Sequence, residues 1–298
     1  MLEAASPRYG EKAIFALLAG CALLSVATTT AIVIALIGPT IGFFGEVGIS
    51  EFLFGTDWAP AFEPASFGVL PLVVGTLSVT LWGMLFAIPI GLGAAIYLSE
   101  YARPGVRKVI KPALEVLAGI PTVAIGFFAV AFITPELLQR IFPSAGIFLA
   151  LAGGLGIGLM VVPIIASISE DAMRAVPGGL REGAYAMGAT KMRVATRVVF
   201  PAALSGIVAS IVLAISRAVG ETMIVVLAAG STPNLTFNPI EPIQAMTAYI
   251  AVTATGEIAQ GTIKYDTIFA VGTLLFVMTL VMNVISIRLV RRFREVYE

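Results

Sequence analysis

The chain contains no histidine and only one cysteine, Cys21, among its 298 residues. Transition-metal sites rely on clusters of these two residue types, and nucleophilic catalysis commonly pairs serine or cysteine with histidine. Sites of these kinds are therefore excluded, and no catalytic residue or metal ligand is predicted. One cysteine cannot form a disulfide bond within the chain, and Cys21 lies in an apolar run as a small apolar residue.

Charge is also scarce. Charged residues make up 12% of the chain and apolar residues 58%, whereas a soluble domain carries about 25% charged residues. The composition therefore indicates an integral membrane protein. The formal net charge is zero, which argues against a nucleic acid as partner.

A nucleotide-binding motif is missing as well. No Gly-x4-Gly-Lys-Ser/Thr loop, which cradles the phosphates of ATP, occurs anywhere in the sequence. The chain is therefore predicted to be neither an ATPase nor the holder of a cofactor. The sequence also shows no recognisable set of catalytic residues, which argues against an intramembrane enzyme.

Long apolar runs are what the sequence does have. A membrane-spanning helix needs about 20 apolar residues. Six runs meet this length, at about 13–37, 69–98, 113–134, 146–168, 202–229 and 266–289. They predict an all-α integral membrane protein with about six transmembrane helices. Pro71 and Pro89 are expected to split or kink the second run, and Pro121 and Pro163 to kink the third and fourth.

The distribution of Lys and Arg predicts the orientation. If both termini are cytoplasmic, 15 of the 18 basic residues fall in inner segments and one, Arg217, within a span. Only Arg140 and Lys264 remain for the outer loops. Positive residues concentrate on the cytoplasmic side, so this topology is strongly favoured. Two outer segments, 38–68 and 230–265, are long enough to meet a soluble partner or cap a cavity.

The longest inner loop spans residues 170–201 and carries four basic residues between Arg181 and Pro201. Its pattern predicts a helix, a break at Gly188, and a second helix that Pro201 ends. Leu180, Ala184, Tyr185 and Met187 are expected to share one side of the first helix. Small apolar side chains beside a hinge suit docking into a groove on another protein.

This loop resembles that of the binding-protein-dependent ABC importer permeases. Their pattern is Glu-Ala-Ala, three residues, Gly, nine residues and Ile-x-Leu-Pro; Gly183 and Phe200 depart from it. Glycine at position 183 weakens the first helix by ~1 kcal/mol relative to alanine. The resemblance implies a type I importer fold and a loop that couples to a separate ATPase. The coupling residues it implies are Glu182, Gly183, Ala184, Tyr185, Gly188 and Pro201.

Two opposite charges lie inside the fifth apolar run. Arg217 and Glu221 are four residues apart, so an uninterrupted helix would place them on one face, where they could pair. An arginine at mid-span costs ~2.5–3.5 kcal/mol, so it needs a partner or a function. One reading is a structural ion pair. The other is an anion site, because the guanidinium fork matches tetrahedral oxyanions. Ser216 and Thr222 add hydroxyl groups beside the pair.

The segment Ser216–Met223 is similar to the Arg-Ala-x-Gly-Glu-Thr segment of phosphate-specific ABC permeases. Further stretches at 67–77, 89–101 and 115–122 look like the second and third spans of that family. The region after residue 247 looks more like its C-type than its A-type subunit. The resemblance covers most of the chain from about residue 65, and it implies that Arg217 and Glu221 belong to phosphate translocation.

Together these features predict a single permease domain over residues 1–298, with its core at about 68–290. The chain would form half of a phosphate importer in a prokaryotic plasma membrane. The implied partners are an A-type permease subunit, two cytosolic ATPase subunits that bind the ATP, and a periplasmic or extracellular phosphate-binding protein. Two alternatives stay open. One is an ABC permease for another solute such as sulfate or molybdate. The other is a gradient-driven transporter, which inverted repeats would favour.

Overall fold

The computed structural model describes residues 9–292, and the side chains of residues 10–288. The basic residues at positions 8 and 294, which the topology prediction counts as cytoplasmic, lie outside this range. The first half of the chain forms α1 (Tyr9–Glu46), α2 (Ile49–Phe54), β1 (Trp58–Ala59), β2 (Ser66–Phe67), α3 (Leu70–Ile96), η1 (Tyr97–Tyr101), α4 (Pro104–Ala118), α5 (Thr122–Phe128), η2 (Ala129–Leu138) and α6 (Gln139–Ile141). The second half forms α7 (Ala150–Ala175), α8 (Gly178–Ala186), α9 (Lys191–Val194), η3 (Ala195–Val199), α10 (Phe200–Ala202), α11 (Leu204–Val219), α12 (Met223–Ala228), α13 (Met246–Thr255) and α14 (Ile263–Arg292).

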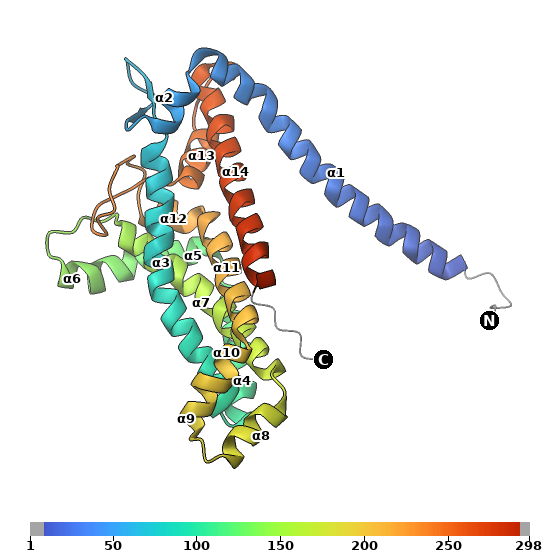
Figure 1. Ribbon diagram of the computed structural model, residues 1–298. Helices are drawn as coiled ribbons and strands as arrows, with labels where there is room; N and C mark the ends of the chain where they lie inside the picture. Colours follow the sequence, from blue (N-terminus) through green and yellow to red (C-terminus); the bar gives the residue numbers. More distant parts are fainter. Residues whose placement is uncertain (1–8, 293–298) are drawn as a thin grey trace.

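The molecule is an elongated helical bundle with two distinct ends. One end carries α8 and α9, and the opposite end carries α2 and the β1–β2 hairpin (Figure 1). We call them the α8 end and the α2 end. Helix α1 leaves the bundle at the α2 end and angles away from it. Its most apolar window of 18 residues is not buried against the described chain. Its last turns pack against α14 through Phe43 and a hydrogen bond between the hydroxyls of Thr40 and Thr273 (2.9 Å).

The centre of the bundle is the contact between α3 and α7. Both helices are rich in glycine where they meet. A Cβ atom at Gly154 would lie 2.7 Å from the Cβ of Trp82, and one at Gly83 would lie 2.9 Å from the carbonyl oxygen of Gly154. Glycine is thus required at these positions, because small residues let two membrane helices approach closely.

The prediction of a helical membrane protein is confirmed. Within residues 9–292, five helices are long and apolar enough to cross a membrane, and a sixth span results if a helix pair bent by 72° is counted as one. Pro71 begins α3 instead of splitting it, and α3 and α7 continue through Pro89 and Pro163. The third run is interrupted, not merely kinked. Its helix ends at Ala118 and a new helix begins at Thr122, because Pro121 has no N–H group to continue the helical hydrogen bonds.

The segment 230–265 is more than an outer loop. Its middle forms α13, which packs among α3, α12 and α14 and buries Met246, Ala248 and Tyr249. The stretch before α13 also folds onto the bundle, since the backbone N–H of Ala150 donates to the carbonyl of Glu241 (2.9 Å). This segment therefore helps to build the α2-end half of the bundle.

Candidate functional site

The predicted site lies where the fifth apolar run breaks. Helix α11 ends at Val219 and α12 begins at Met223, so Gly220, Glu221 and Thr222 form a short non-helical link. The expectation that Arg217 and Glu221 share one face of an uninterrupted helix is therefore wrong. Glycine disfavours helix by about 1 kcal/mol relative to alanine, which makes position 220 a natural place for the break.

Glu221 is held by backbone groups. Its side chain is buried, and its Oε1 accepts hydrogen bonds from the N–H groups of Met223 (3.1 Å) and Ile224 (3.4 Å). These N–H groups open α12 and would otherwise lack partners. The main-chain carbonyl of Glu221 in turn accepts a hydrogen bond from the Thr247 hydroxyl (2.8 Å). The carboxylate thus stabilises the link itself, and its Oε2 has no hydrogen bond with a described residue.

Arg217 is exposed on α11 and forms no ion pair with a described carboxylate. The hydroxyl of its neighbour Ser216 donates to Oδ1 of Asn283 on α14 (3.1 Å). Because a guanidinium group facing lipid is costly, the face of α11 that bears Arg217 requires water, an anion or another protein chain beside it. The structural ion pair with Glu221 is not formed.

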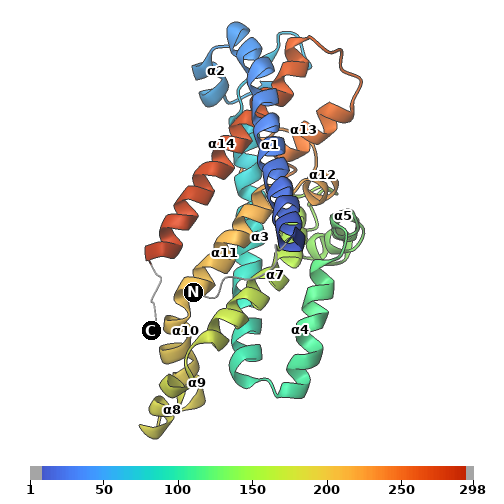
Figure 2. The same cartoon turned by 90° about the vertical axis from the view of Figure 1, so that its right-hand side faces the viewer.

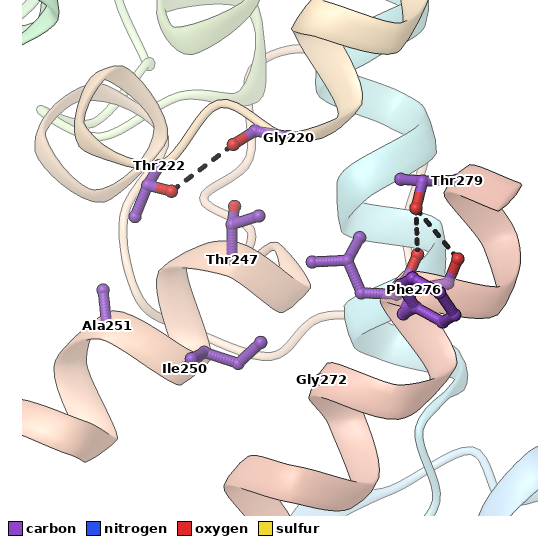
Figure 3. A pocket seen from close by; sticks show the side chains of 9 residues that line it. Gly220, Thr222, Thr247, Ile250, Ala251, Gly272, Phe276 and Thr279 are labelled. Atoms are coloured by element: carbon purple, nitrogen blue, oxygen red, sulfur yellow. Dashed lines mark hydrogen bonds between the residues drawn. The ribbon is translucent and has the colours of Figure 1, made fainter. Parts of the chain in front are cut away.

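A cavity of about 490 Å³ opens beside the link. Figure 3 shows hydroxyl groups from three separate segments on its wall, those of Thr222, Thr247 and Thr279. The remaining lining residues are Gly220, Ile250, Ala251, Gly272, Leu275 and Phe276. Of the four predicted pathway residues, Thr222 lines the cavity, Glu221 lies between two lining residues, and Ser216 and Arg217 lie about one turn back along α11. Thr247 and Thr279 were missed because they lie far away in the sequence.

The predicted coupling segment projects from the α8 end of the bundle (Figure 1, Figure 2). Tyr185 is half-exposed and Met187 and Met192 are largely exposed, whereas Ala184 is buried against the bundle. The expectation that Ala184 shares the outward docking side is therefore wrong. Glu182 and Gly183 are exposed on α8. Pro201 does not end the second helix, because the helical stretch continues through Ala202 and bends by 72° only there, before α11.

Arg181 anchors the coupling segment. Its guanidinium donates to the carbonyls of Met173 (2.7 Å) and Val176 (2.6 Å) at the end of α7, and to Oε1 of Glu100 in η1 (3.1 Å). These bonds satisfy carbonyl groups that the end of α7 leaves free. A movement of α8 would therefore pull on both α7 and the end of the second span.

A charge cluster around a buried carboxylate joins the same end of α7 to α4. Glu170 is fully buried near the end of α7, and its carboxylate accepts hydrogen bonds from Arg107 Nε (2.7 Å) and Lys111 Nζ (2.8 Å) of α4. Arg174 approaches to 3.7 Å, and the exposed Asp171 also pairs with Lys111. Burial lowers the pKa of the Lys111 ammonium, but its hydrogen bonds to Asp171 and Glu170 outweigh this effect and raise it.

The family follows from comparison with known proteins. Residues 87–295 match the family described as "binding-protein-dependent transport system inner membrane component". The chain belongs to this family. It is thus the inner-membrane component of a binding-protein-dependent transport system, and its several apolar helices make it a multi-pass permease.

Among curated relatives, the permease is 36% identical to a probable ABC transporter permease, YqgH, of Bacillus subtilis, over 87% of this chain and 84% of that protein. It is 31% identical to the phosphate transport system permease PstC of Pasteurella multocida, over 85% and 82% of the two chains. It is 34% identical to PstC 1 of Mycobacterium tuberculosis, over 76% and 73%. The resemblance to phosphate permeases is thereby confirmed at the level of sequence.

Solved structures confirm the fold. The permease superposes on a chain of a bacterial alginate ABC transporter with a TM-score of 0.66 and 19% identity, covering 96% of this chain and 98% of that one. A chain of the MetNI methionine ABC transporter gives a TM-score of 0.56 and 20% identity, over 76% and 95%. These are type I importers, as the sequence predicted.

Proposed function

We propose that this permease forms one half of the translocation pathway of an ATP-driven phosphate importer. Several relatives of similar length are named as phosphate permeases. The observation that carries the proposal is the exposed Arg217, which has no acidic partner among the described residues and lies about one turn from a hydroxyl-lined cavity. A guanidinium fork and several hydroxyl donors match the oxygens of a tetrahedral anion.

Glu221 favours phosphate over sulfate in this proposal. Its Oε1 is engaged with the start of α12, whereas Oε2 is free to accept a hydrogen bond. Hydrogenphosphate carries an O–H group that can donate such a bond, but sulfate has none. A carboxylate beside the pathway therefore penalises a fully ionised anion more than a protonated one.

The partners follow from the same proposal. A second permease chain of the A type would cover the face of α11 that bears Arg217, and a phosphate-binding protein would dock at the α2 end. Two ATPase subunits would grip the coupling segment and its counterpart. The Lys and Arg distribution supports a cytoplasmic α8 end and cytoplasmic termini.

Uptake of labelled phosphate and sulfate into vesicles tests the cargo. The vesicles would hold this permease with its partner permease, ATPase and binding protein. ATP-dependent phosphate uptake that excess sulfate does not inhibit is expected. Uptake of another solute alone would contradict the phosphate proposal, and that outcome is a specific alternative because YqgH is named without a cargo. Uptake that follows the proton gradient and ignores ATP would contradict the importer mechanism.

The coupling segment offers a matched pair of substitutions. Gly188 has φ +77°, a left-handed conformation that costs other residues about 1 kcal/mol, whereas Gly183 lies within α8. A new Cβ meets nothing within 4 Å at either position, so only the backbone preference differs. Gly188→Ala is expected to reduce co-purification of the ATPase about fivefold, and Gly183→Ala to leave it unchanged or raise it. Equal co-purification of both variants would argue against the docking role.

A further inference from the structure

A second cavity lies at the α2 end, separate from the cavity beside Glu221. Its volume is about 220 Å³, several times the ~30 Å³ that a water molecule occupies in the liquid. It lies among the β1–β2 hairpin, the stretch before α13, α13 itself and the start of α14. Its wall is formed by Trp58, Ala59, Pro60, Ala61, Phe62, Ser231, Pro233, Gln244, Tyr249, Thr253 and Lys264.

Trp58 in this wall has an unsatisfied hydrogen-bond donor. The side chain is 3% exposed, and its indole Nε1 has no hydrogen-bond partner among the described residues. The ring packs edge-on against Tyr249, with 4.9 Å between the ring centroids. A buried donor without a partner costs about 1–3 kcal/mol. The Nε1 of Trp82 in the α3–α7 contact is similarly unpartnered among the described residues, but only Trp58 also lines this cavity, where a bound acceptor could offset the cost.

Lys264 adds a positive charge to the same wall. It forms no ion pair with a described residue, whereas the other basic residue of the predicted outer loops, Arg140, pairs with Glu136. No Asp or Glu lines the cavity. Asp57, next to Trp58 in sequence, accepts a hydrogen bond from the Ser66 hydroxyl through Oδ2 (2.8 Å), and neither Glu63 nor Asp266 lines the cavity. The buried amide of Gln244 supplies a further donor, so the wall favours an anion with several acceptor oxygens.

Helix α13 connects the two cavities. Thr247, Ile250 and Ala251 line the cavity beside Glu221, whereas Tyr249 and Thr253 line the second one. At helical spacing these two sets point to different sides of α13. The two cavities therefore lie on different sides of the same short helix.

We propose that the Trp58–Lys264 cavity is an outer oxyanion site, at which a small tetrahedral anion binds before it reaches the cavity beside Glu221. The identity of the anion as phosphate rests on the proposed function. The existence of an anion site rests instead on the donors that line the cavity. The site lies wholly within this chain, so it can be tested on the purified full-length permease.

Intrinsic fluorescence provides a direct test because the chain has only two tryptophans. In Trp82→Phe, Trp58 is the sole reporter, and titration with inorganic phosphate in detergent micelles should change its emission saturably. Sodium chloride at equal ionic strength should not. Trp58→Phe, which retains Trp82 in the α3–α7 contact, is the matched control and should not respond. If Trp82→Phe does not fold, the difference between wild type and Trp58→Phe isolates the same signal.

Two further variants locate the anion. Lys264→Gln should raise the Kd for phosphate about tenfold, since one hydrogen bond to a charged group is lost, and Lys264→Arg should restore binding. Arg217→Lys should leave the Trp58 response intact even where uptake fails. Emission that responds to neither phosphate nor sulfate in a folded chain, or a response unaffected by Lys264→Gln, would overturn the site. A response to sulfate without phosphate uptake by the complex would retain the site and refute the phosphate proposal.

Discussion

Arg217→Lys is expected to lower phosphate uptake at least tenfold while the complex still assembles. Lysine keeps the positive charge but loses the planar fork that can donate two parallel hydrogen bonds to one oxyanion. Losing a hydrogen bond to a charged group costs ~1.5–3 kcal/mol, and 1.4 kcal/mol corresponds to a factor of ten. ATP-dependent uptake of labelled phosphate into vesicles measures the effect.

Assembly should survive because Arg217 has no carboxylate partner among the described residues. Its replacement therefore leaves no buried acid without a counter-charge. Arg140→Lys is the matched control, since this arginine is exposed and pairs with Glu136 one helical turn away. Exposed pairs of this kind contribute about 0–1 kcal/mol, so uptake should remain near the wild-type rate. Wild-type uptake by Arg217→Lys would remove Arg217 from the pathway.

The sequence was most informative about the membrane spans and least informative about how they break. Apolar runs of sufficient length predict spans reliably, because each span must satisfy its own backbone groups in lipid. The break at Gly220–Thr222 was hidden because the apolar residues Met223–Ala228 continue the run beyond it. The fold of 230–265 was missed for the opposite reason: prolines and polar residues read as a solvated loop, yet α13 packs among three helices.

Side-chain contacts could not be predicted from spacing along the sequence alone. Arg217 and Glu221 were expected to pair through helical spacing, and the link between them removed that spacing. Ala184 was placed on the docking side by periodicity alone, but periodicity does not say which side of a surface helix faces the bundle. The partners of Glu170 lie 59 and 63 residues away, on a helix whose packing no local pattern in one sequence reveals.

The ion pairs of Glu170 with Arg107 and Lys111 give the second large expected effect, which is on stability. Glu170→Gln is expected to destabilise the permease by about 3 kcal/mol, because it leaves Arg107 and Lys111 without the buried carboxylate that joins α4 to α7. Both cations are partly exposed and retain some contact with water, which places the cost at the lower end of the 3–5 kcal/mol typical of broken buried pairs. The free energy of unfolding in mixed micelles measures it.

Asp171→Asn is the matched control because Asp171 pairs with the same Lys111 but is 61% exposed. Its loss should cost less than about 1 kcal/mol, as for other exposed pairs. The contrast between two neighbouring acids isolates burial as the cause. Equal stability of the two variants would show that the cluster does not join α4 to α7. If Glu170→Gln is the less stable variant, we also expect it to weaken binding of the ATPase to the coupling segment. The reason is that the end of α7 carries the carbonyls that hold Arg181 and therefore α8.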